Sequence, residues 1–529
     1  MKTLFVALSI LDAILRLCGA ASLEELPEAQ LEHYYQLCEH PLKLNEASRS
    51  ELLALDFLSP FEIASILDYR QRNGDILSAS ELGSVIGIDT QKALDLSHFL
   101  SFESSLRPSQ RQGGSSYYLE GTMRNGLKNS TVSSLYKVRG EAGPWNLGLS
   151  ATDKLQNYYL SYTKASFSLL AGSFNIHYGQ GLLLWSGFSL NSLSTPNALI
   201  RNPAFALPSN SSSSSAALQG LSLSFDSGQF SFELSAFDRC LAARLLLSTL
   251  RSNLALTALH SSDYNALGMD AKASLGKFTL WAETALILRR ESLSSAIIGG
   301  LRYNIAYRQS LSLGLRAYSP LYDSPYASAL SLFGKTQDQW ALTLAYQSQE
   351  LDFCLDAGGR ISSSDKALRA ALSYVQTWEK GDWAIEGRLR NRLKIKPSAS
   401  ALVDLKAELK ATRGELEVQL KGIIQRGEKW SGLAELDLKL AGVKCYLAYY
   451  EAPVWAERLY AYAPDVPGSF AIKQYYGRGY AIGLCSNLKD MALKLGYQRQ
   501  LDGRPSSFEL RMYLRFRMSG RVPRLKKEH

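Results

Sequence analysis

The feature that most constrains this chain is a strict alternation of apolar and polar residues near its C-terminal end. Between Phe508 and Met518 the apolar residues occupy every second position, and glutamate, tyrosine and arginines fill the positions between them. Successive side chains of a β-strand point to opposite faces, so this pattern predicts a strand with one apolar and one polar face. Its eleven residues are enough for a tilted strand to cross the hydrocarbon core of a membrane.

The same alternation recurs through most of the chain. Residues 221–235 alternate on both sides of a turn at 226–229, and residues 434–449 alternate on both sides of Ala441-Gly442. Such pairs predict antiparallel hairpins, and their charged faces suit a water-filled lumen better than a packed core. We therefore expect a mainly β fold over residues 115–518, a large antiparallel transmembrane β-barrel of about 22 to 26 strands. A soluble sandwich or propeller, which would also alternate, is the alternative.

The N-terminal residues 1–21 have the pattern of a secretory signal peptide. Lys2 precedes an apolar stretch that is too short to span a bilayer, and small residues follow from Gly19 onward. We predict cleavage after Ala20 or Ala21, with an ordinary N-terminal helix as the alternative. No long uncharged apolar run occurs downstream, which argues against membrane-spanning helices. Export and the predicted barrel together predict a location in the outer membrane.

Charge divides the rest of the chain in two. Residues 22–105 contain fifteen acidic and five basic residues, a net charge of −10, whereas residues 106–529 carry a net charge of +18. Opposite charges imply two domains with different surroundings. We place a helical domain at residues 22–103, a linker at 104–114 and a basic tail at 519–529.

Capping residues predict four short helices in the acidic domain. Asn45 and Ser48 are candidate caps of the first helix, and Pro60 occupies a first-turn position of the second. Asn73-Gly74 ends that second helix. The spacing of Ser78 and Glu81 is that of a capping box, and a last helix follows Gly87.

The helical region resembles a known DNA-binding module. The segments that carry the likeness are Leu44–Ser48, Glu51–Leu55, Ile66–Arg70, Asn73-Gly74, Ser80–Leu82 and Val85–Ile88. They resemble the tandem helix-hairpin-helix domain of competence-type DNA-binding proteins. That resemblance implies an all-α domain in which glycines let backbone N–H groups reach a DNA phosphate at each hairpin turn.

Both hairpin turns depart from the pattern of that family. The first turn lacks glycine, and the second places a carboxylate where the family has its second glycine; the turn residues are Phe57, Leu58, Ser59 and Pro60, and Gly87, Ile88 and Asp89. A net charge of −10 also repels a polyanion. We therefore expect these degenerate turns to contact an envelope protein partner or the chain's own barrel, with DNA as the disfavoured partner.

One long segment interrupts the alternation between Phe174 and Leu218. Its first half is apolar and glycine-rich, and its second half contains a serine run at Ser211–Ser215. We interpret the first half as a candidate plug segment, residues 178–188, that folds into or across the barrel, and the second half as a mobile surface loop. The residues that carry this prediction are Tyr178, Gly179, Gln180, Gly181, Trp185, Gly187 and Phe188. The alternative is that residues 181–188 form another strand.

The combination of an acidic hairpin domain, a large barrel and this glycine-rich segment resembles the helix-hairpin-helix outer-membrane proteins of the Bacteroidetes type. The resemblance implies no activity, and the sequence contains no nucleophile elbow, phosphate loop or zinc-ligand spacing. We expect no enzyme, cofactor or metal site. The predicted function is a gated conduit or envelope assembly scaffold in the lipid of the outer membrane, with its helical domain in the periplasm. The alternative is a DNA-uptake pore with a DNA-binding hairpin domain.

Overall fold

The computed structural model describes most of the predicted barrel and part of the acidic N-terminal region. The described residues are 13–18, 34, 37–38, 41–45, 47, 52, 55, 57–58, 60–85, 87–88, 90–103, 116–164, 166–187, 193, 195–201, 203–211, 217–227, 229–249, 252–289, 292–306, 309–348, 350–397, 401–467, 472–488 and 490–521. Most of the predicted signal peptide, the whole linker at 104–114 and most of the basic tail lie outside them.

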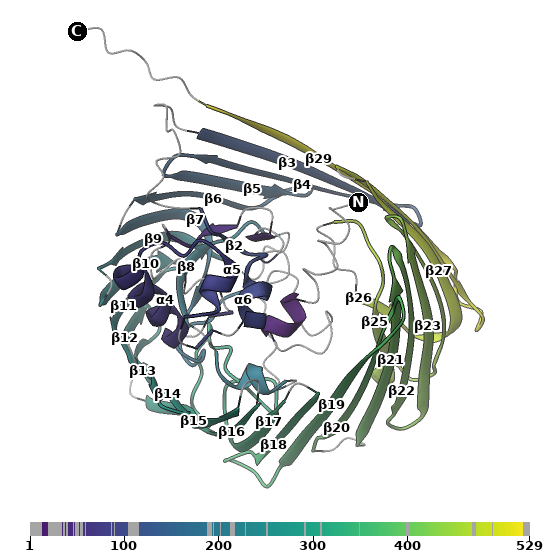
Figure 1. Ribbon diagram of the computed structural model, residues 1–529. Helices are drawn as coiled ribbons and strands as arrows, with labels where there is room; N and C mark the ends of the chain where they lie inside the picture. Colours follow the sequence, from purple (N-terminus) through teal and green to yellow (C-terminus); the bar gives the residue numbers. More distant parts are fainter. Residues whose placement is uncertain are drawn as a thin grey trace.

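A single closed antiparallel barrel dominates the fold (Figure 1). Its first strands are β3 (Ser116–Lys128), β4 (Thr131–Ala142), β5 (Trp145–Ala151), β6 (Leu155–Lys164), β7 (Phe167–His177), β8 (Ala204–Pro208), β9 (Leu218–Asp226), β10 (Phe230–Phe237), β11 (Cys240–Ser248), β12 (Ser252–Ser261), β13 (Asn265–Leu275) and β14 (Phe278–Arg289). The remaining strands are β15 (Ser292–Ala306), β16 (Gln309–Tyr318), β17 (Gln339–Gln347), β18 (Leu351–Gly359), β19 (Lys366–Lys380), β20 (Trp383–Ile395), β21 (Leu402–Arg413), β22 (Leu416–Arg426), β23 (Trp430–Leu440), β24 (Val443–Ala452), β27 (Gly477–Leu488), β28 (Met491–Gln500) and β29 (Ser507–Arg521).

The barrel closes between its last and first strands. Glu509 to Arg521 of β29 pair with Lys128 to Ser116 of β3, so the ladder has no open edge. The short β8 pairs with the end of β7 beyond the part that pairs with β9, so β8 and β9 occupy successive lengths of one edge. When β8 and β9 are counted as one position in the wall, the barrel has twenty-four strands. This confirms the predicted large antiparallel barrel and its range of strand numbers.

Two sequence boundaries require correction. Residues 204–208, expected in a mobile loop, form β8, because the edge of β7 extends past β9 and its backbone groups find partners there. Of the serine run, only Ser211 is described. The last strand extends to Arg521, because β3 begins early enough to pair with residues 519–521.

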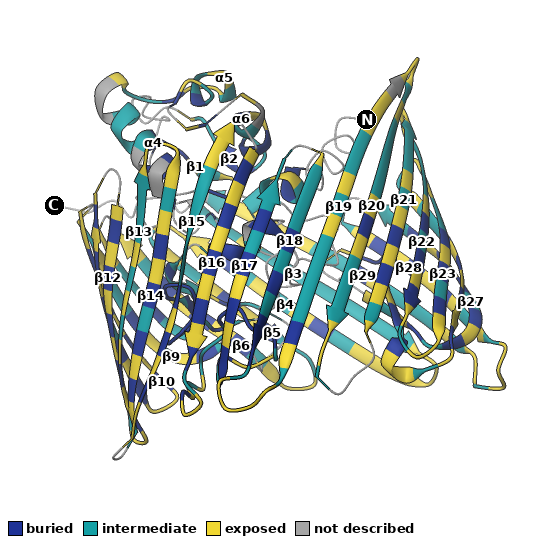
Figure 2. Ribbon diagram, turned by 90° about the horizontal axis from the view of Figure 1, so that it is seen from below, coloured by how far each residue is buried: buried dark blue, intermediate teal, exposed yellow. Residues whose placement is uncertain are grey.

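Alternation along the strands separates the two faces of the wall (Figure 2). In β16, Leu311, Leu313 and Leu315 are 42%, 43% and 60% exposed on the outside, whereas Ser312 and Arg316 are buried on the inside. Exposed leucine, isoleucine and aromatic side chains continue this outer surface around the barrel. An apolar exterior around a polar interior is the arrangement that hydrocarbon stabilises, because a closed ladder pairs the backbone groups of neighbouring strands with one another.

The two ends of the barrel differ in the length of their connections. At the end where β3 begins and β29 finishes, adjacent strands are joined by segments of two or three residues, such as 143–144 and 441–442. The opposite end carries the long connections 178–203, 319–338 and 453–476, which we call the first, second and third inner loops. The third contains η3 (Trp455–Glu457), β25 (Leu459–Tyr462) and β26 (Ile472–Tyr475).

The acidic region forms a small helical unit with its own apolar core. Its described elements are β1 (Leu42–Lys43), α4 (Pro60–Asn73), α5 (Ala79–Leu82), α6 (Thr90–Leu96) and β2 (Leu100–Ser101). The predicted helix from Pro60 to Asn73 is confirmed, and it ends at Gly74, whose φ of +87° favours glycine. The predicted capping residues also act as expected: the Glu81 N–H donates to Ser78 Oγ, and the Glu81 carboxylate accepts from the N–H of Leu77.

Asn45 does not cap a helix. Its side-chain amide donates to the carbonyls of Ile76 and Glu103, both at 2.9 Å, and its Oδ1 accepts the N–H of Ile76 at 2.8 Å. Asn45 is 4% exposed, so an amide with two donors and an acceptor satisfies three buried or half-buried backbone groups there. Most of the first predicted helix, including Ser48, lies outside the described residues.

The helical unit lies at one mouth of the barrel (Figures 1 and 2). Helix α4 packs against β12, and Glu62 and Lys92 are within electrostatic reach of Lys272 on β13. Lys272 pairs with Asn253, the second residue of β12, which places the contact at the end with the short connections. Residues 13–18 of the predicted signal peptide are helical, and Ala13 and Ile14 lie in the core of the unit.

Candidate functional site

The candidate plug segment leaves the barrel wall at the end of β7 and folds into the lumen. Three of its glycines have positive φ, +57° at Gly179, +90° at Gly181 and +89° at Gly187, which lets the backbone turn sharply. An N–H···O bond of 2.9 Å from Tyr178 to Leu184 closes the resulting turn. Residues 178–187, the part of the segment that the structure describes, form no strand, and an isolated bridge joins Trp185 to His177.

A buried carboxylate of the barrel wall holds this turn. Glu283 on β14 is 4% exposed and accepts the backbone N–H groups of Gln180 at 2.5 Å and Leu182 at 3.2 Å. A Cβ added to Gly179 would lie 2.5 Å from the carboxyl carbon of Glu283. The wall also makes room for an apolar side chain, because a Cβ on Gly268 would lie 2.6 Å from Leu183 Cδ1. The surfaces of the segment and the wall are therefore complementary in shape.

Arg201 and Gln180 close the first inner loop on itself. The Gln180 side chain accepts the N–H of Arg201 at 2.9 Å and donates to its carbonyl at 3.1 Å, as a second backbone would. The Arg201 guanidinium lies 4.7 Å from the ring centroid of Trp185 and donates to the carbonyl of Ser328. Burial lowers the pKa of Arg201 to about 10, so the side chain is still charged at neutral pH.

The second inner loop packs over the candidate plug segment. Tyr322 donates to the carbonyl of Leu182 at 2.8 Å, and Ser324 donates to the carbonyl of Leu183 at 2.9 Å. Burial raises the pKa of Tyr322 well above its ordinary value, so its hydroxyl stays a donor. The N–H of Ser328 completes the contact by donating to Gly181 at 2.9 Å. The carbonyls of the turn are thus satisfied by a loop that lies far away in the sequence.

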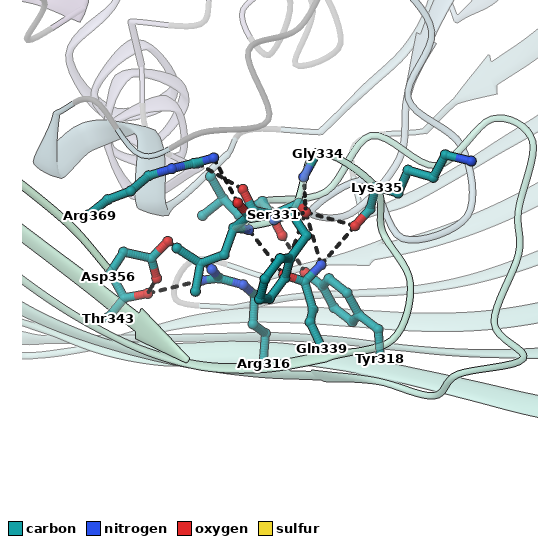
Figure 3. Close-up of polar contacts among 12 residues, drawn as sticks. Arg316, Tyr318, Ser331, Gly334, Lys335, Gln339, Thr343, Asp356 and Arg369 are labelled. Carbon is teal, nitrogen blue, oxygen red and sulfur yellow. Dashed lines mark hydrogen bonds and ion pairs between the residues drawn. The ribbon is translucent and has the colours of Figure 1, made fainter. Parts of the chain in front are cut away.

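The second inner loop has its own polar support on the wall (Figure 3). Gln339, fully buried, accepts the N–H of Leu332 at 3.0 Å and donates to Ser331 Oγ and to the Lys335 carbonyl. Arg369 on β19 donates to the carbonyls of Ser331 and Leu332 at 2.9 and 2.8 Å. Hydrogen bonds from several strands hold this loop inside the barrel.

The third inner loop is held on another part of the wall by ion pairs. Asp465, with a fully buried carboxylate, binds Lys494 of β28 at 3.0 Å and Arg511 of β29 at 2.5 Å. On its other side Lys421 binds Glu435 and donates to the carbonyl of Tyr462 at 3.4 Å. Two buried networks therefore fasten the loop at separate points.

The residues of the two hairpin turns lie apart from this site, in the helical unit. Phe57 and Leu58 are 4% and 0% exposed, and the Phe57 ring lies 4.4 Å from that of Tyr34 and 4.8 Å from that of Phe99, centroid to centroid. Side chains packed in this way have no surface for a ligand. Pro60 begins α4, Gly87 has a φ of +92°, and Ile88 is buried. Ser59 and Asp89, like Phe188 of the candidate plug segment, lie outside the described residues.

Sequence reasoning missed the second and third inner loops and the wall residues that hold them. Glu283 and Asp465 are the clearest omissions. Glu283 is an acidic residue at an inward position of a strand, and Asp465 lies between two prolines in a segment without alternation. Such isolated carboxylates were the available signal, but nothing in the sequence indicated their partners.

A closed wall with an apolar exterior and inward-folded polar loops defines a β-barrel of the outer-membrane type. Among solved structures the chain is similar to the translocation pore of the P pilus usher PapC, at 12% identity, with 76% of this chain and 99% of that chain covered and a TM-score of 0.41. It is also similar to the Escherichia coli P pilus tip assembly intermediate PapC-PapD-PapK-PapG, at 11% identity, 78% and 62% coverage and a TM-score of 0.49. Pseudomonas aeruginosa OccK5 (OpdH) follows at 9% identity, 77% and 98% coverage and a TM-score of 0.29.

No protein-family model matches the chain, and no curated protein sequence matches it. Within the described parts of the chain, no helix is both long and apolar enough to cross a membrane. The same described residues include no group of three or more histidine, cysteine, aspartate or glutamate side chains arranged to hold a metal ion.

Proposed function

We propose that this protein is a gated conduit of the outer membrane, with a lumen narrowed from one end by the inner loops and from the other by the acidic helical unit. The observation that carries the proposal is a closed barrel of twenty-four strands, apolar outside, with three loops fastened inside it. Barrels of 16 to 18 strands already leave an aqueous channel, so a wider one needs internal elements to restrict flow.

The ends of the barrel support an orientation. Outer-membrane barrels have short periplasmic turns and longer extracellular loops. The end with two- and three-residue connections also holds the start of β3, the end of β29 and the helical unit. We infer that the helical unit is periplasmic and that the inner loops enter the lumen from the outer surface.

We further infer that the helical unit keeps a hairpin fold without the DNA ligand. Its first turn buries Phe57 and Leu58, and the acidic residues 22–105 would repel a duplex. A domain of −10 tethered to a basic barrel by about ten residues has an effective concentration near millimolar, so weak attraction is enough for docking. Opposite charges are screened over about 8 Å at physiological ionic strength, so salt should loosen the contact.

The test compares the full chain with a variant that lacks residues 22–105 in planar lipid bilayers. Both proteins are first checked for a closed barrel by heat-dependent migration in gels. We expect the deletion to raise single-channel conductance, by more at low salt than at high salt. Equal conductance at both salt concentrations would refute gating by the helical unit. A full chain that inserts and conducts nothing would instead favour the assembly scaffold.

A further inference from the structure

One stretch of the lumen wall carries a row of basic side chains. The inward positions of β20 are occupied by Arg388, Arg390, Arg392 and Lys394, while Leu389 between them is 46% exposed on the outer face. From Arg388 to Lys394 the strand extends about 20 Å, and with a tilt of about 40° the row covers roughly half of the hydrocarbon thickness of about 30 Å. A strand face with four successive bases suits a water-filled lumen better than a packed apolar core.

The neighbouring strand extends this basic surface. Register places Lys406 of β21 opposite Arg390, and Lys410 opposite Glu386. Three acids interleave with these bases, as in the pairs Arg392–Asp404 at 2.5 Å and Lys406–Glu408 at 2.7 Å. The inward positions of β20 and β21 together hold six bases and three acids, a net charge of +3 on these two strands, and Glu417 of β22 lies 3.7 Å from Lys410.

This basic surface lies between two parts of the wall that anchor inner loops. The hydrogen bonds that hold the second inner loop reach Arg369 on β19, and the ion pairs that hold the third begin at Lys421 on β22. The side chains of Arg388, Arg392 and Lys410 are 19%, 27% and 20% exposed, while Arg390 and Lys406 between them are buried. On the wall beside the second inner loop, by contrast, the Arg316 side chain is 2% exposed and bound to Asp356.

We propose that the inward face of β20 and β21 is an anion track, a surface that binds and conducts small solutes bearing carboxylate or phosphate groups. Guanidinium groups bind both kinds of anion through paired N–H donors, and a row of them lets an anion pass from one site to the next. Basic walls of low dielectric also concentrate anions and exclude cations. This inference rests on the proposed conduit and adds the class of solute that the conduit carries.

The first experiment measures ion selectivity of the full chain in a potassium chloride gradient. We expect a chloride preference of about tenfold at low salt that falls as salt screens the wall. The test variant is Arg390→Gln with Lys394→Gln, which should bring the preference close to unity. Arg388 and Arg392 stay in place, because removing them would leave Glu386 and Asp404 without their ion pairs in the wall.

A matched control removes the same charge from outside the lumen. Arg413 ends β21 on the face of the exposed Leu409, and Arg426 ends β22 on the face of the exposed Ile424. The variant Arg413→Gln with Arg426→Gln should keep the selectivity of the wild type. Heat-dependent migration in gels verifies that each variant folds, and the single substitution Lys394→Gln replaces the test variant if the double one does not.

A second probe is inorganic phosphate added at millimolar concentration. Phosphate should reduce the chloride current of the wild type and of the control, and affect the test variant several-fold less. A channel that conducts without preferring anions, or a test variant as selective as the wild type, would overturn the anion track and leave the conduit standing. A folded, inserted chain with no conductance would overturn the conduit and the track with it.

Discussion

Replacing Glu283 with alanine should release the candidate plug segment from the wall. The carboxylate accepts two backbone N–H groups, from Gln180 and Leu182, in a buried position. A hydrogen bond to a charged group contributes about 1.5–3 kcal/mol, so the seated segment loses roughly 3–6 kcal/mol. Relief of the desolvation of the carboxylate offsets part of this loss, and we expect a net effect of about 3 kcal/mol.

A change of this size is large for a gate. At about 1.4 kcal/mol per factor of ten, the released state should become roughly a hundredfold more populated relative to the seated state. Single-channel recording should then show more frequent or longer high-conductance events. Limited proteolysis should cut within residues 178–187 of Glu283→Ala under conditions that leave the wild type intact.

The conservative variant Glu283→Gln separates charge from shape. Both N–H groups donate to the same oxygen of Glu283, so the carbonyl oxygen of glutamine can accept both of them, and only the negative charge is lost. Its effect should therefore be smaller than that of Glu283→Ala. Identical gating and identical protease resistance of the wild type and Glu283→Ala, with the barrel folded in both, would refute the assignment of Glu283 as the anchor.

The other predictions concern the remaining contacts. Asp465→Asn should weaken the attachment of the third inner loop to Lys494 and increase current noise at low salt; unchanged noise would argue against a role for the ion pair. The pKa of Asp338 lies below its ordinary value of 3.8 because Ser362 donates hydrogen bonds to the carboxylate. The stability that the ionised Asp338 adds to the second inner loop is therefore complete above that ordinary value and is lost as pH falls through the lower pKa of the folded state. Protease cleavage of this loop should rise only in strong acid, and a rise near neutrality would contradict the prediction. The isolated residues 22–105 should bind duplex DNA no better than an unrelated acidic protein at physiological salt; micromolar, salt-sensitive binding in a fluorescence assay would show that the hairpins still work.

Local sequence patterns were sufficient to predict the strands that form the wall of the barrel. The alternation between Phe508 and Met518 depends only on which side of a strand meets hydrocarbon, and the pairing of β29 follows from it. The ends of α4 could likewise be predicted, because a proline at the first turn and Asn73-Gly74 at the last act within a few residues.

The sequence by itself predicted a large antiparallel barrel that follows an acidic helical unit, because side-chain periodicity and charge are local properties of the chain. The predicted end of the barrel fell three residues short of the end of the last strand. Only the tertiary structure decided what lies inside that wall. Glu283 meets Gln180 about a hundred positions away, and Asp465 meets Arg511, because closing a barrel of twenty-four strands brings distant inward positions together. Asn45 shows the same limit on a smaller scale: its type suits a helix cap, but the packing of residues 76 and 103 around it gave its amide other partners.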